Sequence, residues 1–304
     1  MNNITKNQNR KELIKMLEAQ RYLYSKAKRI FNTRISVSLT IAIIGPMLIS
    51  NFDQTKVFVA AISIAYILLD IILLEKMESR SREYAAKIQE LFDVTLFELG
   101  WNNVVIGKKP EMELIYENSS KFIANKKNNS SELKNWYPEK INELDPLSAT
   151  LICQRSNVWW DVNLRKNFIR LLYLLLIVFL VFGICISIIK NQDAKTMVIL
   201  LFSFFNLFKI LLKQINSQEA TIKNTEHIKD HLEKLIEDTM DGNKSKSDLK
   251  NNIRIIQDEI YRHRKFCFSL PDWLHKFFRE TNEKQMVYNA DIHVAKLSKV
   301  QILE

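Results

Sequence analysis

The densest group of side chains able to do chemistry lies in residues 153–165, which combine arginine, asparagine, tryptophan and aspartate. On a helix, Asn157, Asp161 and Arg165 recur every four residues and form one polar stripe. Arginine binds phosphate or carboxylate groups, and tryptophan stacks on bases. We therefore predict a ligand-binding or coupling surface made of Arg155, Asn157, Trp160, Asp161 and Arg165. Two alternatives stay open: a buried structural network, and a belt of tryptophan and arginine at a membrane interface.

A second polar group lies in residues 257–265 (QDEIYRHRK) and is followed by Pro271-Asp272-Trp273. Asp258 and Arg262 have the i, i+4 spacing of an ion pair on a helix. The basic run makes Arg262 and Arg264 candidate partners of a ligand phosphate. The alternative is a solvated helix end, where cations are favoured.

Four polar residues interrupt long apolar runs: Asp70, Ser203, Asn206 and Lys209. Ionisable groups inside a membrane are functional candidates by default. Asp70 and Lys209 lie near the ends of their runs, so we expect them to reach water by snorkelling. Asn206 lies in the middle of its run. It either lines a pore or hydrogen-bonds a neighbouring helix, and we favour the second.

No motif of an enzyme is present. His227 and His231 have the spacing of two zinc ligands on a helix, but the intervening Ile-Lys-Asp lacks the glutamate of a metalloprotease motif. Cys153, Cys185 and Cys267 are isolated. The sequence contains no Walker motif, no GxSxG and no HExxH. We therefore expect neither catalytic residues nor a metal or cofactor.

The composition favours long helices as the elements that position these residues. Only 5 glycines and 5 prolines occur in 304 residues. This scarcity argues against barrels, sandwiches and Gly-looped nucleotide folds, which need many tight turns. The 3 cysteines form no framework, so we expect a reducing compartment rather than a disulfide scaffold. The predicted class is all-α.

Four apolar runs predict membrane spans at residues 36–52, 57–74, 171–189 and 196–212. The first contains Gly45-Pro46, which should kink a helix. Short connections, residues 53–56 and 190–195, join the runs in pairs. Such connections suit antiparallel helices. We therefore predict an integral membrane protein with two transmembrane hairpins.

The charges predict the orientation of these spans. The net charge is +10, and residues 1–35 hold 9 Lys and Arg against 2 acids. Other cations flank the cytoplasmic ends of the predicted spans, whereas the two hairpin loops hold few. The positive-inside rule then places both termini and the middle region in the cytoplasm. The excess charge suits anionic lipid headgroups, so binding to a nucleic acid polymer is not expected.

The chain divides on this basis into five parts: a cytoplasmic amphipathic helix 1–35, hairpin 36–75, helical insert 76–167, hairpin 168–213 and a C-terminal helical region 214–304. Within them, residues 102–107 (NNVVIG) are the only strand-like piece. Asp145-Pro146 predicts a helix start, and one helix is expected from there through the third span. A helix after the fourth span should stop at Gly242. Leu249, Ile253, Ile256 and Ile260 predict a packing seam.

Several short motifs, in order along the chain, resemble one bacterial family. They are Ala19-Gln20-Arg21-x-Leu23-Tyr24-Ser25-x-Ala27-Lys28, Phe92-Asp93-Val94 with Trp101-Asn102, Trp136-Tyr137-Pro138, Cys153-Gln154-Arg155-x-Asn157 with Trp160-Asp161 and Leu164-Arg165, Gln257-Asp258 with Arg262, and Pro271-Asp272-Trp273 with Glu280. The chain resembles the four-transmembrane effectors associated with SMODS-type cyclic-oligonucleotide synthases. Gly100, where proline is expected, is a departure.

The resemblance implies a role in cyclic-oligonucleotide-based antiphage signalling (CBASS). A synthase activated by phage produces a cyclic di- or trinucleotide. The effector then assembles as a homo-oligomer and damages the bacterial inner membrane, which halts the cell by abortive infection. The alternative function is a non-catalytic membrane scaffold or receptor that docks a cytoplasmic protein partner through the helical seams.

Overall fold

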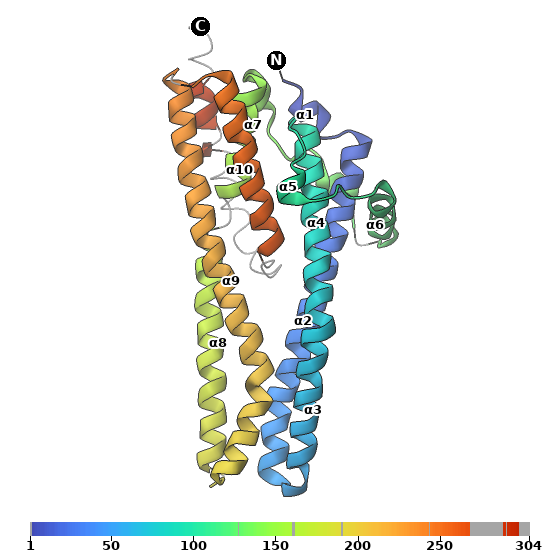
Figure 1. Cartoon of the computed structure of the whole chain (residues 1–304), viewed down its shortest axis with the longest axis vertical. Helices are drawn as coiled ribbons and strands as arrows, with labels where there is room; N and C mark the ends of the chain where they lie inside the picture. Colours follow the sequence, from blue (N-terminus) through green and yellow to red (C-terminus); the bar gives the residue numbers. More distant parts are fainter. Residues whose placement is uncertain are drawn as a thin grey trace. The chain divides into compact units, whose positions relative to one another are not determined.

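A computed structural model of the chain describes residues 2–126, 128–159, 162–189, 191–242, 244–267, 288–289 and 291–297. Within these ranges the regular structure is entirely helical (Figure 1), which confirms the predicted class. The main helices are α1 (Ile4–Asn7), α2 (Lys11–Asn51), α3 (Lys56–Leu69), α4 (Glu75–Leu96), α5 (Asn103–Ile106), α6 (Met112–Ala124), α7 (Pro146–Trp159), α8 (Val162–Ile189), α9 (Ala194–Met240) and α10 (Lys246–Phe266). Short elements are the 3-10 turns η1 (Asp53–Thr55), η3 (Ser130–Leu133) and η4 (Glu139–Glu143), and the π-helix η2 (Asp70–Leu74).

The chain forms two compact units, each described by itself. The hairpin unit comprises Ser25–Ser81 and Lys166–Glu219. The three-segment unit comprises Met1–Tyr24, Arg82–Arg165 and Ala220–Glu304. Helices α2, α4, α8 and α9 each run across a unit boundary. No helix break marks these boundaries between the units.

Four helices have the length and apolar composition needed to cross a membrane: Lys11–Asn51, Asp53–Leu96, Phe168–Ile189 and Ala194–Met240. They contain the predicted runs 57–74, 171–189 and 196–212 in full, and run 36–52 except for Phe52. Between the first two, α2 ends at Asn51 and η1 leads directly into α3. Between the last two, α8 ends at Ile189 and α9 begins at Ala194. Figure 1 shows each pair as a helical hairpin, as the short connections predicted.

The hairpin unit has an apolar exterior and small residues at its helix contacts. Val57, Phe58 and Ile188 are among its many exposed large apolar side chains. A Cβ atom added to Gly45 of α2 would lie 3.0 Å from Ser203 Cβ of α9. Glycine therefore permits the close approach of these two helices, as is common for helices packed in membranes. Pro46 lies inside α2, which continues to Asn51.

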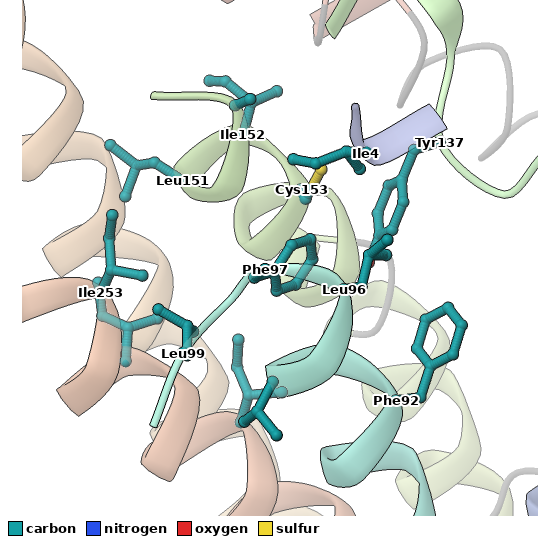
Figure 2. Close-up of a cluster of buried hydrophobic side chains, with 14 of the residues drawn as sticks. Ile4, Phe92, Leu96, Phe97, Leu99, Tyr137, Leu151, Ile152, Cys153 and Ile253 are labelled. Carbon is teal, nitrogen blue, oxygen red and sulfur yellow. The ribbon is translucent and has the colours of Figure 1, made fainter. Parts of the chain in front are cut away.

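The core of the three-segment unit is apolar and draws on helices far apart in the sequence. Figure 2 shows Ile4 of α1, Phe92 of α4, Leu151 of α7 and Ile253 of α10 within one buried cluster. The predicted seam of α10 lies in this cluster, because Leu249, Ile253, Ile256 and Ile260 are all buried. Burial of one face of each helix supplies most of the stability that these helices need.

Local capping explains where several elements start and stop. Asp145 Oδ1 accepts hydrogen bonds from the backbone N–H groups of Leu147 and Ser148, at 2.9 and 3.3 Å. This confirms the helix start predicted there. Helix α9 ends at Met240, and Gly242 follows with a φ of +69°, as its residue type predicted.

The prediction of a strand-like piece at residues 102–107 is wrong for Asn103–Ile106. These residues form helix α5, because the Asn102 side chain caps its first turn by accepting from the N–H groups of Val104 and Val105. The single helix expected from residue 146 through the third span is described as α7 and α8. Residues 160 and 161, which connect them, lie outside the described ranges.

Candidate functional site

A chain of buried amides and carboxylates joins α7, α10 and α4 in the three-segment unit. Gln154 Nε2 donates to Gln257 Oε1 over 3.0 Å and to the backbone oxygen of Ile253 over 3.0 Å. Gln257 Nε2 donates in turn to Glu90 Oε2 at 2.8 Å and to Asp93 Oδ2 at 3.0 Å. Gln154, Gln257 and Glu90 have no exposed surface. We use the name glutamine network for Gln154, Gln257, Glu90 and Asp93 together with Arg254, Arg264, Asp258 and Asn102, whose contacts are described below.

Two arginines of α10 neutralise the two carboxylates of α4. Arg254 Nη2 donates to Glu90 Oε1 at 2.8 Å and to Asp258 Oδ1 at 2.6 Å. Arg264 Nη1 donates to Asp93 Oδ2 at 2.5 Å. Buried charges persist only where partners of this kind are present.

The loop before α5 is tied to the same network. Asn102 Nδ2 donates to Asp258 Oδ2 at 2.7 Å while its Oδ1 caps α5. Arg254 Nη1 donates to the backbone oxygen of Gly100 at 2.9 Å. The residues around Trp101-Asn102 are therefore held against α10 by both a side chain and a backbone contact.

Helical periodicity explains why α10 can supply so many groups. Its apolar seam faces the core, and Arg254, Gln257, Asp258 and Arg264 follow the edge of that seam at helical intervals. On α4, Glu90 and Asp93 are three residues apart and so lie on one face. The two faces bring the carboxylates opposite the arginines and the glutamine.

The pKa values of Glu90 and Arg264 in the glutamine network are both shifted by their surroundings. Desolvation, reinforced by the nearby Asp93 charge, raises the pKa of Glu90, although Gln257 and Arg254 oppose the shift. Burial acts to lower the pKa of Arg264, but the carboxylate of Asp93 outweighs it and the pKa is raised. Arg264 therefore remains a cation committed to Asp93. A phosphate ligand would have to displace that carboxylate.

The predicted site residue Arg155 forms an ion pair on the other side of α7. Its Nε and Nη2 atoms lie 2.8 and 2.6 Å from Glu233 Oε1 of α9. His293 Nε2 lies 3.6 Å from the other oxygen, Glu233 Oε2. Burial and the Arg155 charge lower the pKa of His293 despite this carboxylate. Arg155 is buried, so its first role in the described structure is to join α7 to α9.

The predicted site residue Asn157 contacts the Trp136-Tyr137-Pro138 motif. Asn157 Nδ2 donates to the Tyr137 hydroxyl at 2.9 Å, and Trp136 Nε1 donates to Asn157 Oδ1 at 3.3 Å. Tyr137 also lines a hollow of about 420 Å³, a volume within the usual range of small-molecule sites. Its lining is mostly polar and consists of Thr5, Lys6, Gln8, Asn9, Asn135, Tyr137, Pro138 and Glu139.

The structure shows less of the other residues predicted in segments 153–165 and 257–273. Arg165 is buried. Trp160, Asp161 and the Pro271-Asp272-Trp273 motif lie outside the described residues. The expected ion pair between Asp258 and Arg262 is wrong, because Asp258 is taken by Arg254 and Asn102, whereas Arg262 pairs with the neighbouring Glu259.

In the hairpin unit, Asp70 lies in a buried ion cluster. Its Oδ1 accepts from Arg34 Nε at 2.5 Å, and its Oδ2 accepts from Lys209 Nζ at 2.5 Å. Arg34 also binds Glu78, and Lys213 binds Glu75. The expectation that Asp70 snorkels is wrong. Its side chain is 0% exposed, because Arg34 of α2 and Lys209 of α9 contact it and neutralise it in place of water.

The other polar residues of the spans make uncharged contacts. Asn206 Nδ2 of α9 donates to Ser38 Oγ of α2 at 2.8 Å, which is an interhelical bond of the kind favoured by the sequence. Ser203 Oγ bonds the backbone oxygen of Leu200 in its own helix. Among the residues that the structure describes, no group of three or more His, Cys, Asp or Glu side chains is arranged to hold a metal ion.

Comparison with known families identifies the family of this chain. The sequence model of the SMODS-associating 4TM effector domain matches residues 2–293. The chain belongs to this family. A probable CBASS effector molecule of Bacillus cereus (strain VD146) is 29% identical over 294 residues, covering 92% of this chain and 94% of the relative. No solved structure matches the chain.

In this 4TM effector, motifs that are scattered in the sequence meet in the glutamine network. Hydrogen bonds link Asp93, Gln154 and Gln257, and another links Asn102 to Asp258. Arg254 and Glu90 join these two sets. Sequence reasoning weighed a buried structural network as one alternative for the Cys153–Arg165 segment, and Gln154, Arg155 and Asn157 all have structural partners.

Sequence reasoning missed the partners of these residues. Glu90, Glu233, Arg254 and Arg34 were not singled out. Arg254 carries a usable signal, since it lies four residues before Asp258. Glu90 and Glu233 are single acids within long helices, and only the tertiary contact shows their role. Arg34 lies just before the first apolar run, where a cation is normally taken to mark the cytoplasmic end of a membrane span.

Proposed function

We propose that this 4TM effector is triggered by a cyclic di- or trinucleotide to oligomerise and permeabilise the bacterial inner membrane during antiphage signalling. The observation that carries the proposal is the family match over residues 2–293 in a chain with four helices able to span a membrane. The association of the family with SMODS synthases supports a cyclic oligonucleotide as the signal. The relative from B. cereus is named as a probable CBASS effector.

The hairpin unit would lie in the bilayer. Its exposed apolar side chains suit lipid, and the charged groups of its interior are paired with one another. The three-segment unit would lie in the cytoplasm, where the synthase product is found. The excess of Lys and Arg in residues 1–35 supports this orientation.

The lesion would require several copies of the chain. Within the hairpin unit, α2, α3 and α9 fill their own interior with side chains such as Phe204 and Ile49. A water-filled path would therefore form between subunits. Helix α8 is the natural contact, because only 17% of the apolar window of Phe168–Ile189 is buried within one chain. Helix α8 would contact lipid before assembly and a neighbouring subunit after assembly.

The signal would be received by the three-segment unit. A ligand shifts the protein between two states only if it binds one of them better. Arg155, Asn157, Trp160, Asp161, Arg165, Arg262 and Arg264 remain the proposed coupling or ligand surface. Since Arg155 and Arg264 are paired with carboxylates, they suit coupling between helices. The half-exposed Arg262 and the hollow beside Tyr137 suit contact with the ligand itself.

The proposal is tested in bacteria that carry the effector with a SMODS-type synthase. Uptake of a membrane-impermeant DNA dye is followed by flow cytometry after the synthase is induced. We expect uptake with the active synthase and none with a synthase inactivated at its catalytic carboxylates. Equal uptake with both synthases would refute the cyclic-nucleotide trigger. Absence of uptake with either, from an inserted effector, would favour the docking of a cytoplasmic protein partner instead.

A further inference from the structure

Ion pairs join six charged side chains of the hairpin unit into a cluster, which we call the charge latch. It contains three cations and three carboxylates: Arg34, Lys209, Lys213, Asp70, Glu75 and Glu78. The side chains of Arg34, Asp70 and Glu78 are at most 3% exposed. Buried charges that lose a partner destabilise a structure strongly, so the members of such a cluster hold one another in place.

Asp70 is the shared centre of the latch. Its Oδ1 accepts from Arg34 Nε at 2.5 Å, and its Oδ2 accepts from Lys209 Nζ at 2.5 Å and from Arg34 Nη2 at 3.2 Å. Arg34 belongs to α2, and Lys209 belongs to α9. The contact from Arg34 therefore closes the first hairpin on itself, whereas the contact from Lys209 fastens the first hairpin to the second.

The π-helix η2 explains how three carboxylates reach one cluster. In an α-helix, residues five apart point about 140° away from each other. The i→i+5 hydrogen bonding of a π-helix brings such residues toward one face. Residues Asp70–Leu74 are π-helical, so Glu75 follows Asp70 onto the same side, and Glu78 lies three residues further along that face. Inserted turns of this kind are frequent at functional sites.

An uncharged contact also joins the two hairpins. Asn206 Nδ2 of α9 donates to Ser38 Oγ of α2 at 2.8 Å. Lys209 and Lys213 both come from α9 and make charged contacts with the first hairpin. Movement of α9 away from α2 and η2 would remove both cations at once and leave Asp70 and Glu75 short of partners.

We propose that the charge latch holds the two hairpins in the resting arrangement and must open before the membrane is permeabilised. This inference rests on the proposed function, because the latch would explain why the effector does not permeabilise the membrane before the trigger binds. A trigger then needs to supply only enough differential binding free energy to separate α9 from Asp70 and Glu75. A substitution that removes a cation from the latch should also favour the separated arrangement, without any trigger.

The experiment measures dye release from liposomes that contain the purified full-length protein, without nucleotide. In Lys209→Met, the α9 cation is lost and the apolar stem is retained. We expect the release rate to rise at least about tenfold over wild type, since loss of a buried charge partner shifts such equilibria by more than one decade. Lys209→Arg keeps the charge and should stay close to wild type. Lys121→Met, which removes an exposed pair on α6, is the matched control.

A second measurement reports hairpin separation independently of leakage. Ser38→Cys and Asn206→Cys place two thiols at an existing contact between α2 and α9, with Cys185→Ser removing the exposed native thiol. We expect rapid disulfide formation with Lys209 present and a several-fold lower yield with Lys209→Met. Unchanged yield and unchanged release in folded, inserted Lys209→Met protein would overturn the latch.

The two readouts separate the latch from the proposed function. A lower disulfide yield with no release from any variant, and none from wild type with a panel of cyclic nucleotides, would support the latch and refute permeabilisation. If Lys209→Met does not insert, Lys213→Met carries the same test, because its side chain is 48% exposed and tolerates substitution better. Its expected rise in release is smaller, about two- to fivefold. No rise from folded Lys213→Met would overturn the latch in that case.

Discussion

Gln154 on α7 and Gln257 on α10 are hydrogen-bonded through their side-chain amides, with Nε2 of Gln154 donating to Oε1 of Gln257 over 3.0 Å. This bond fixes the orientation of the Gln257 amide, because its oxygen is occupied and its nitrogen must face Glu90 and Asp93. One buried glutamine therefore sets the hydrogen-bonding direction of the other. Helices α7, α10 and α4 are consequently coupled, and displacement of one changes the partners of the other two.

Replacement of Gln257 tests the coupling. Gln257→Leu keeps the volume but removes the bonds to Glu90, Asp93 and Gln154. Buried carboxylates that lose a donor destabilise the fold, so we expect a loss of about 2–3 kcal/mol in the free energy of unfolding. The measurement is thermal unfolding in detergent followed by circular dichroism. Asn251→Leu, on the exposed side of α10, is the control. Equal midpoints for both variants would contradict the role given to Gln257.

The stability of the three-segment unit should depend on pH through Glu90. Burial, with help from Asp93, raises the pKa of Glu90 above its ordinary value of 4.5. An acid with a higher pKa when folded binds protons more readily in the folded state. Its ionisation therefore reduces stability as the pH rises from about 4.5 through the folded pKa. Glu90→Gln removes that loss.

The check is the difference in unfolding midpoint between Glu90→Gln and wild type across this pH range. We expect the difference to move in favour of the variant as the pH rises. A difference that is constant with pH, or that moves in favour of wild type, would show that the carboxylate is ionised at little cost, stabilised by Arg254 and Gln257.

Substitution of two predicted site residues should separate structural from ligand contacts. Arg155 is buried against Glu233, so Arg155→Ala should lower the unfolding midpoint, and its effect should be non-additive with Glu233→Ala. Arg262 is half-exposed beside Glu259, so Arg262→Ala should change stability by no more than about 0.5 kcal/mol.

The ligand response of the same variants then tests the proposed surface. We expect Arg262→Ala to weaken the response to cyclic nucleotide at unchanged stability, measured as the nucleotide concentration that gives half-maximal dye release. If Arg155→Ala and Arg262→Ala both retain the full response, neither residue contributes to reception or coupling of the signal.

The proposed orientation predicts which cysteines an impermeant maleimide reaches in intact spheroplasts. In a Cys185→Ser background, Gln54→Cys lies in the exposed turn of the first hairpin, and Lys134→Cys lies on the surface of the three-segment unit. We expect labelling of Gln54→Cys from outside, and labelling of Lys134→Cys only after permeabilisation. The reverse pattern would place the three-segment unit outside the cell.

The helical class and the hairpins follow from the sequence because each depends on local properties. Apolar runs and short connections specify the hairpins, and Asp145 and Gly242 mark helix ends through their own side chain or backbone freedom. The short helix after Asn102 was missed, because strand propensity of Val104 and Val105 was weighed above the capping side chain before them. Unit boundaries within continuous helices carry no local signal.

The candidate site was predictable only in part, for a different reason. Gln154, Arg155 and Gln257 stand out as polar residues in motifs, but their partners Glu233, Glu90 and Ile253 lie far away in the sequence. Asp70 was expected at the water interface because its apolar run gives no sign that Arg34 and Lys209 converge on it. Long-range pairing of this kind requires tertiary contacts that periodicity does not encode.

The central claim is that a cyclic nucleotide opens a membrane lesion made by this chain. The most direct test is dye release from liposomes that carry the purified protein, against a panel of cyclic di- and trinucleotides. We predict release with one nucleotide and none without it, with a steep dependence on protein density because several subunits form the lesion. No release with any nucleotide, from protein shown to be folded and inserted, would contradict the claim and turn attention to a cytoplasmic protein partner.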